Sequence, residues 1–98
     1  MKIVKTGMSG TMESSDINVV IEKGHDPGIK IHLQSSVEKQ FGDQIRSVIL
    51  ETLKEMEVHD VVVRAVDRGA LDCTIRARVQ SAVMRAARKE NEMDWGIL

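Results

Sequence analysis

The 98 residues are 42% hydrophobic, which suits one compact domain with a single core and leaves little room for a second domain. Fourteen Lys and Arg residues are balanced by 15 Asp and Glu residues, and aromatic side chains make up only 2% of the chain. Both the positive field and the stacking platforms of a nucleic-acid-binding protein are therefore missing. The single cysteine excludes an internal disulfide, the first residues lack the apolar core of a signal peptide, and no apolar run approaches the roughly 20 residues that cross a membrane. We expect a soluble protein of the reducing cytoplasm that binds neither nucleic acid nor a membrane.

The chain begins with a short mixed segment, residues 1–8, which we interpret as a weak strand at the edge of the sheet or an extended arm. Residues 10–16 read Gly-Thr-Met-Glu-Ser-Ser-Asp, a small and polar composition that favours an exposed turn whose side chains bond locally. Most such segments are only connections, but a hydroxyl on a surface loop is also a good point of attachment. Ser14 is the residue that we single out, although the chemistry of the turn does not distinguish it from Ser15.

Two strands are predicted next. Residues 17–22 place apolar side chains on one face at the two-residue period of a strand. Residues 23–28 concentrate glycine, proline and aspartate, which predicts that the two strands form a hairpin. The returning strand, residues 29–34, alternates apolar and polar side chains, so we expect one face of the sheet to contact water.

At Ser35 the hydrophobic period changes to that of a helix. Residues 35–38, Ser-Ser-Val-Glu, have the pattern of a capping box, in which a serine and a glutamate three residues later each satisfy a free amide of the helix start. The helix is expected to run to about residue 57, with Gly42 weakening it by up to about 1 kcal/mol relative to alanine. Its apolar stripe is Val37, Phe41, Ile45, Val48, Ile49, Leu53 and Met56.

Residues 58–66 include a β-branched run that is too continuous for a strand with one wet face, so we predict a central strand there. Residues 67–70 interrupt the pattern, and Asp72 suits the first turn of a second helix. The apolar positions of that helix are Leu71, Ile75, Val79, Ala82, Val83 and Ala86.

The predicted fold is α+β, with a small, mostly antiparallel sheet of three to four strands and two helices packed on one face. The order of elements is strand, loop, strand, strand, helix, strand, helix. Residues 1–89 are expected to form the single domain, and residues 90–98 a mobile tail.

Catalytic and metal-binding patterns are not found. The histidines His25, His32 and His59 fall in different predicted elements without the spacing of metal ligands. No serine or cysteine can be paired with a histidine and an orienting carboxylate, so we do not predict an enzyme. A thiolate at Cys73 would be favoured by the start of the second helix, although a lone cysteine there usually packs as a small apolar residue.

Cationic residues give the second helix a basic character. Most such runs are solvated faces, but this one also suits docking to an acidic partner or to phosphates that the protein itself carries. The residues are Arg76, Arg78, Arg85, Arg88 and Lys89. Trp95 in the tail is similarly either part of a loose end or an anchor for a partner's pocket.

Two segments together carry a family resemblance. Residues 10–17 read Gly-Thr-Met-Glu-Ser-Ser-Asp-Ile, and residues 66–79 read Val-Asp-Arg-Gly-Ala-Leu-Asp-Cys-Thr-Ile-Arg-Ala-Arg-Val. A third segment, residues 35–42, is similar to the helix start of the same family. The chain resembles the citrate lyase acyl carrier proteins, the gamma subunits of bacterial citrate lyase, from residue 1 to about residue 87.

The resemblance implies a carrier rather than a catalyst. It places on Ser14 a covalent phosphodiester to phosphoribosyl-dephospho-CoA, whose terminal thiol holds an acyl thioester, and it implies a holo-carrier synthase that attaches this group. In the implied cycle the alpha subunit exchanges the acetyl group for citrate, and the beta subunit splits the citryl thioester, so that citrate yields acetate and oxaloacetate. Phosphates of the group are candidates for contacts with Arg76, Arg78 and Arg85. The alternatives are an unmodified interaction module that docks through its basic second helix, and thiol chemistry at Cys73.

Overall fold

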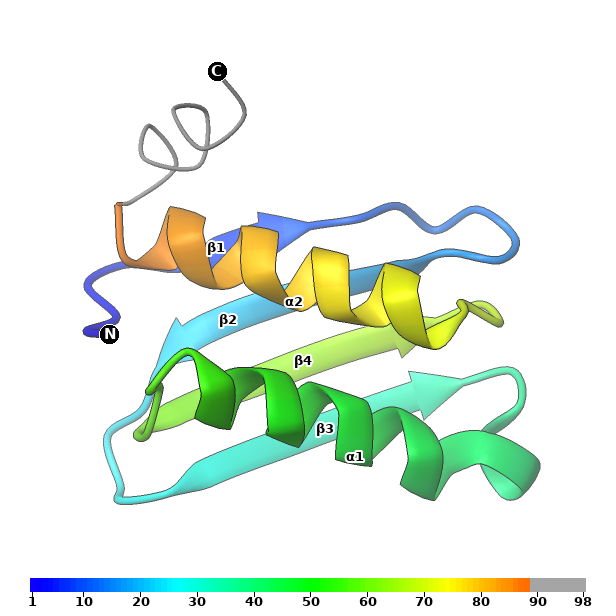
Figure 1. The fold of residues 1–98 in the computed structure, drawn as a ribbon, viewed down its shortest axis with the longest axis horizontal. Coiled ribbons are helices and arrows are strands. Elements are labelled where there is room, and N and C mark those ends of the chain that lie inside the picture. Colours follow the sequence, from blue (N-terminus) through cyan, green and yellow to red (C-terminus); the bar gives the residue numbers. More distant parts are fainter. Residues whose placement is uncertain (89–98) are drawn as a thin grey trace.

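The computed structural model describes residues 1–88; the predictions for Lys89, for Trp95 and for the tail lie outside these residues. The chain forms a four-stranded sheet and two helices in the predicted order (Figure 1). The elements are β1 (Gly7–Ser9), β2 (Ile17–Lys23), β3 (Ile29–Ser35), α1 (Glu38–Glu55), β4 (Val61–Asp67) and α2 (Asp72–Ala86). The α+β class is confirmed.

The sheet has the strand order β1-β2-β4-β3, which confirms that the β-branched run lies in the centre. β2 pairs antiparallel with β1 and with β4, whereas β3 pairs parallel with β4. The predicted hairpin between β2 and β3 is therefore wrong, because β4 is inserted between the two strands. The most apolar strand takes the position with neighbours on both sides, and the parallel pairing is possible because α1 provides the crossover from β3 to β4.

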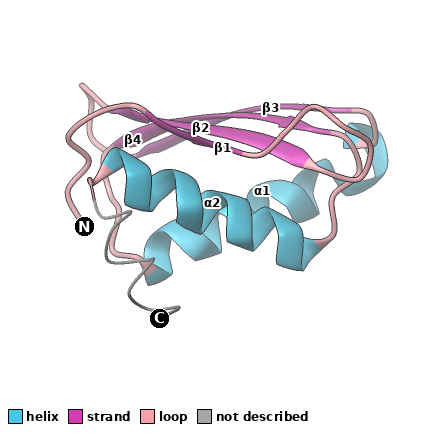
Figure 2. Ribbon diagram, turned by 90° about the horizontal axis from the view of Figure 1, so that it is seen from above, coloured by secondary structure: helices cyan, strands magenta, loops and turns pink. Residues whose placement is uncertain are grey.

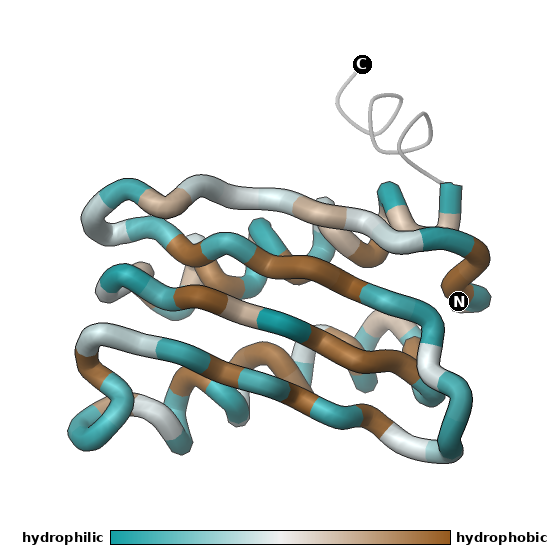
Figure 3. The backbone as a smooth tube through the Cα atoms, turned by 180° about the vertical axis from the view of Figure 1, so that it is seen from behind, coloured by the Kyte–Doolittle hydropathy of each residue, from teal (hydrophilic) through white to brown (hydrophobic). Residues whose placement is uncertain are grey.

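Both helices cover the same face of the sheet, and the other face is open, as predicted (Figure 2). Seen from the open side, apolar and polar residues alternate along the strands (Figure 3). In β4 the side chains of Val61, Val63 and Ala65 are buried, while Val62 and Val66 are only half-buried on the open face. The continuous apolar run of β4 thus reflects its central position rather than a cover of helices on both faces.

The predicted core is largely confirmed, with two exceptions. Phe41 and Leu71 were expected in the apolar stripes, but they are 51% and 70% exposed. Both lie where a helix begins, Phe41 in the first turn of α1 and Leu71 at the N-cap of α2, and no further layer covers them. The buried helical side chains are Ile45, Val48, Ile49 and Leu53 of α1 and Ile75, Val79, Ala82, Val83 and Ala86 of α2.

The predicted capping box is also wrong. Ser35 ends β3, and its hydroxyl donates to Asp67 Oδ2 at 2.8 Å. Its oxygen accepts the amide of Val37 at 3.1 Å, not that of Glu38 as a capping box requires. Val37 is the N-cap residue and forms no side-chain cap, while Glu38 pairs with Arg46 at 2.9 Å. The Ser35 side chain thus orders the connection from β3 to α1 without capping the helix, which ends at Glu55.

The N-terminal segment is held close to α2. The amides of Val4 and Lys5 both donate to the carbonyl of Ala86, at 2.9 and 3.1 Å. At Gly7 a Cβ atom would lie 2.3 Å from the carbonyl oxygen of Ala82, so only glycine allows this approach of β1 to the helix. The contact fixes where the following loop, residues 10–16, begins.

Two leucine substitutions test the distribution of the core. Leu53→Ala should lower the free energy of unfolding by about 2 to 5 kcal/mol, because the fully buried side chain leaves a cavity. Leu71→Ala should change it by less than about 0.5 kcal/mol, since that side chain is 70% exposed. Urea denaturation of the two variants measures both values; equal losses would contradict the assignment of Leu71 to the surface.

Candidate functional site

The loop that carries Ser14 lies at the end of the sheet where α1 and α2 begin (Figure 1). It is joined there to the connection between β4 and α2. The amide of Ser15 donates to the carbonyl of Arg68 at 2.8 Å, and the amide of Arg68 donates to the carbonyl of Asp16 at 2.8 Å. Two segments more than 50 residues apart in the chain therefore form one surface.

Ser14 occupies the second position of a tight turn. The amide of Asp16 donates to the carbonyl of Glu13 at 3.2 Å, and Ser15 has a φ of +66°, the positive value that the third position of a type II turn requires. Both serines are exposed, and neither hydroxyl makes a hydrogen bond with any of residues 1–88. The structure thus presents the Ser14 hydroxyl to solvent at the tip of an ordered turn, as the sequence predicted for this segment.

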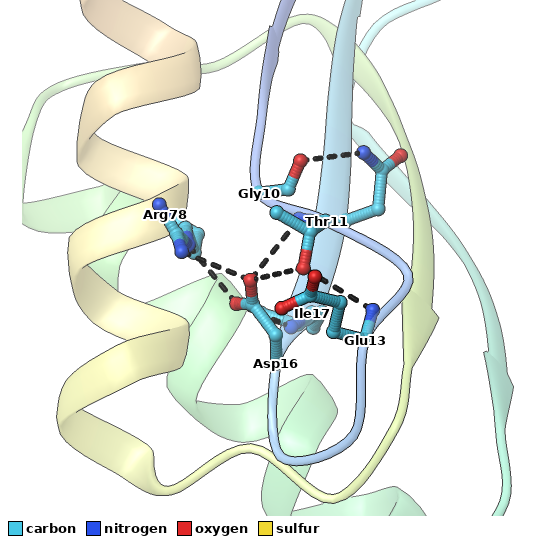
Figure 4. Close-up of polar contacts among 7 residues, drawn as sticks. Gly10, Thr11, Glu13, Asp16, Ile17 and Arg78 are labelled. Atoms are coloured by element: carbon cyan, nitrogen blue, oxygen red, sulfur yellow. Dashed lines mark hydrogen bonds and ion pairs between the residues drawn. The ribbon is translucent and has the colours of Figure 1, made fainter.

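A buried carboxylate closes the base of the turn. Asp16 is 8% exposed, and its Oδ2 accepts hydrogen bonds from the amide and hydroxyl of Thr11, at 3.1 and 2.7 Å. Its Oδ1 accepts the amide of Ile17 at 2.7 Å. Arg78 reaches across from α2 and donates from Nε to Oδ1 at 3.0 Å and from Nη2 to Oδ2 at 2.9 Å (Figure 4). The bidentate pair ties the loop to the helix layer.

The same contacts set the charge state of Asp16. The Arg78 guanidinium, followed by the Thr11 hydroxyl, holds the pKa of the Asp16 carboxyl far below its usual value, and burial opposes the shift only partly. Asp16 is therefore an anion throughout the physiological range, and its oxygens are occupied by donors.

Further bonds stiffen the first half of the loop. Thr11 Oγ1 accepts the amide of Glu13 at 3.2 Å, and Asn18 Nδ2 donates to the carbonyl of Gly10 at 3.2 Å (Figure 4). Gly10 has a φ of +96°, and a Cβ there would lie 1.8 Å from the carbonyl oxygen of Ile17. A side chain at this position is excluded by both conformation and space.

A second buried carboxylate orders the loop that supports the turn. Asp67 is 1% exposed at the end of β4 and accepts the amides of Gly69 and Ala70, each at 3.0 Å, besides the Ser35 hydroxyl. These bonds fix the backbone around Arg68. The Arg68 backbone is hydrogen-bonded to Ser15 and Asp16. Asp67 thus acts on the Ser14 turn through Arg68.

The three arginines predicted as phosphate contacts point to three different elements. Arg78 binds Asp16 at the base of the turn. Arg76 binds Glu55 at 2.9 Å and Glu51 at 3.4 Å on α1. Arg85 Nη1 donates to the carbonyl of Met8 in β1 at 2.6 Å. The structure therefore brings only Arg78 to the loop that carries Ser14.

The other sequence candidates lie outside this site. Cys73 is exposed at the start of α2, so it does not pack as a small apolar residue. Within residues 1–88 no group of three or more His, Cys, Asp or Glu side chains could hold a metal ion, and neither helix is long and apolar enough to cross a membrane. An open groove of about 700 Å³ lies between the starts of α1 and α2, and the exposed Phe41 and Leu71 help to line it.

Asp16 and Arg68 were not singled out from the sequence. A signal for Asp16 exists, because an aspartate directly before an apolar strand commonly accepts local backbone amides. Its pairing with Arg78, 62 residues away, has no local signal. Arg68 contacts the turn through its backbone amide and carbonyl, so its residue type gives no sign of this contact.

Comparison with known proteins identifies the family of this chain. A family model described as "Malonate decarboxylase delta subunit (MdcD)", of the ACP family, matches residues 4–86. The chain is 53% identical to the citrate lyase acyl carrier protein of Vibrio cholerae over 98 residues, covering 100% of this chain and 99% of the relative. It is 50% identical to the protein of that name from Oenococcus oeni over 98 residues, covering 100% of both chains.

A solved structure shares the fold. A chain in the crystal structure of a Pseudomonas malonate decarboxylase hetero-tetramer in complex with malonate superposes with a TM-score of 0.71, at 23% identity and with 84% of each chain covered. The fold and the sequence matches together define the class as acyl carrier proteins on a mixed α+β scaffold. Within that class, the chain belongs to the citrate lyase acyl carrier protein family.

The ion pair at the base of the turn gives a stability prediction. Arg78→Ala should lower the free energy of unfolding by about 1 to 2 kcal/mol, because a buried carboxylate loses two donors while the 38% exposure of the Arg78 side chain limits the effect. Arg64→Ala is the matched control: Arg64 pairs with Glu22 on the open face, and its loss should cost less than about 1 kcal/mol. Urea denaturation at neutral pH compares the two, and an equal effect would contradict a special role for Arg78.

Titration of Asp16 provides a separate test. Because its folded pKa lies below the unfolded value of about 3.9, its contribution to stability is complete at neutral pH and is lost progressively as the pH falls through the acid range. Carbon-13 NMR of the Asp16 carboxyl should show no protonation near pH 4 in the wild type, and a pKa displaced upward in Arg78→Ala. A wild-type carboxyl that titrates near pH 4 would rule out the five-donor environment.

Proposed function

We propose that this chain is the acyl carrier subunit of a citrate lyase, with phosphoribosyl-dephospho-CoA attached covalently to the Ser14 hydroxyl. The observation that supports this assignment is the position of Ser14: its hydroxyl is exposed and without a partner among the described residues, at the tip of a turn held by Arg68 and Asp16. A large group can be joined there without breaking any bond of the fold. The residues present therefore fit the group.

We infer the course of the attachment from general phosphoryl-transfer chemistry and the neighbouring residues. Ser14 Oγ would form a bond to phosphorus of an activated phosphoanhydride, the anhydride leaving group would depart with the bridging oxygen, and the serine proton would pass to a base. Asp16 is a poor base for this step, because its pKa is lowered and its oxygens are occupied. We infer that the base belongs to the attaching synthase, and that this chain contributes the hydroxyl and its orientation.

Once attached, the group supplies a terminal thiol that holds acetyl or citryl as a thioester. The side chains of this chain would then keep the attachment point on a rigid support while the alpha and beta subunits of the lyase, in the cytoplasm, exchange acetyl for citrate and cleave the citryl unit. The chain is proposed to be a non-catalytic subunit of that complex. The alternative, an unmodified module that docks through a basic α2, is weakened because Arg76, Arg78 and Arg85 are already engaged within the fold.

Intact-mass spectrometry tests the attachment. Protein co-produced with the attaching synthase should gain the mass of one phosphoribosyl-dephospho-CoA less one water, and Ser14→Ala should lose the whole adduct. Ser15→Ala is the matched control and should keep it, because the two hydroxyls are adjacent and equally exposed but only Ser14 lies at the second position of the turn. An adduct that persists in Ser14→Ala would overturn the assignment.

A further inference from the structure

Arg68 is the residue most closely joined to the Ser14 turn from outside the loop. Its carbonyl accepts the Ser15 amide, and its amide donates to the Asp16 carbonyl, each at 2.8 Å. These two bonds place the Arg68 backbone directly beside the residues that follow Ser14. The position is itself fixed, because Asp67 binds the next two amides of the same connection.

The side chain of Arg68 is exposed and available to bind another group. Arg68 is exposed, and among residues 1–88 its guanidinium has no hydrogen-bond or ion-pair partner. The three arginines of α2 differ in this respect, since Arg76 binds Glu51 and Glu55, Arg78 binds Asp16, and Arg85 binds a carbonyl of β1. The guanidinium of each of these three is thereby oriented toward a partner within the fold.

Two of these arginines are separated from the turn, Arg85 by its distance along the helix and Arg76 by its direction. Arg85 lies about 20 Å along the axis from the start of α2 at a rise of about 1.5 Å per residue. The turn projects beyond Asp16 toward the start of α2, away from the Arg85 end (Figure 4). Arg76 is directed to α1 by its two glutamates. Among residues 1–88, Arg68 therefore differs from the arginines of α2 in two ways. Its backbone is bonded directly to the turn, and its guanidinium has no partner in the fold.

A phosphodiester on Ser14 would add a permanent negative charge to this surface. Glu13 and Asp16 already flank the serine, and the Asp16 charge is offset by Arg78. A guanidinium is suited to such a group, because its planar donors match two phosphate oxygens and it stays charged at every physiological pH. Among residues 1–88, Arg68 is the arginine that is bonded to this turn through its backbone and whose guanidinium has no partner.

We propose that the Arg68 guanidinium binds the serine-linked phosphodiester of the attached group, a contact that orients the first bonds of the arm away from Glu13. This inference rests on the proposed attachment to Ser14. It assigns the phosphate contact to the loop between β4 and α2 rather than to the arginines of α2.

Phosphorus-31 NMR of the holo-protein tests the contact. The serine-linked phosphodiester and the pyrophosphate of the arm resonate separately, so the two phosphate types can be followed independently. Protein co-produced with the synthase is compared as wild type, Arg68→Ala, Arg68→Lys and the control Arg64→Ala, each first shown by intact mass to carry the arm. Because both bonds from Arg68 to the turn are made by its backbone, Arg68→Ala leaves them in place.

In Arg68→Ala the phosphodiester resonance should shift toward its position in urea-unfolded holo-protein, and its line should narrow as the group becomes freer. Arg68→Lys should shift it part of the way, since the charge remains but the two-pronged donor is lost. Arg64→Ala should leave the resonance at the wild-type position, because Arg64 lies on the open face of the sheet.

A phosphodiester resonance that is unchanged in Arg68→Ala, or a change confined to the pyrophosphate signals, would overturn the contact while leaving the attachment to Ser14 intact. A wild-type protein without any adduct on Ser14 would instead overturn the proposed function, and the contact with it. The intact-mass measurement separates these two failures.

Discussion

The carboxylate of Asp16 accepts hydrogen bonds from Thr11, Ile17 and Arg78 in a nearly closed environment, and the conformation of the Ser14 turn depends on them. A charge buried to this degree is tolerated only when hydrogen-bond donors surround it. The loop that carries Ser14 must therefore pack against α2 so that Arg78 reaches Asp16. The backbone of Asp16 takes part as well, since its amide closes the turn and its carbonyl binds Arg68. One residue thus joins the turn, the loop after β4 and the helix layer.

The central position of β4 makes the contact between the Ser14 loop and the connection from β4 to α2 possible. Since β4 lies between β2 and β3, its end at Asp67 is beside the start of β2, and the connection to α2 passes directly under the Ser14 turn. Asp67 then fixes that connection through the amides of Gly69 and Ala70. The buried carboxylate of Asp16, just before β2, thus orders the loop of residues 10–16, and that of Asp67, at the end of β4, orders the connection to α2. Backbone hydrogen bonds join these two loops.

The sequence predicted the features that depend on local patterns. Alternation, β-branched content and helical spacing located β2, β3, β4 and both helices to within a few residues, whereas β1 lies at the end of the segment predicted for it. Composition placed Ser14 on an exposed turn. The predictions that were wrong concern which strands pair and which groups form hydrogen bonds. The hairpin failed because β4 pairs with β2 at the edge where β3 was expected, and the capping box failed because Ser35 belongs to β3 and its oxygen accepts the amide of Val37. Phe41 and Leu71 follow the helical period but begin helices that no further layer covers.

The same distinction explains the site. The hydroxyl of Ser14 could be found from the turn, whereas the bond between Asp16 and Arg78 and the backbone bonds of Arg68 join residues separated by more than 50 positions. The sequence named three arginines of α2 together as candidates for phosphate contacts. Only the packing of α2 against α1, β1 and the loop shows that each has a different partner.

We propose that the turn held by Asp16 presents Ser14 for modification. The most direct test is the initial rate at which the purified attaching synthase modifies folded apo-protein. Arg78→Ala, still folded by circular dichroism, should be modified roughly tenfold or more slowly than the wild type, because the serine is no longer held in one orientation. Arg64→Ala should be modified at the wild-type rate. Equal rates for folded Arg78→Ala and the wild type would contradict the claim.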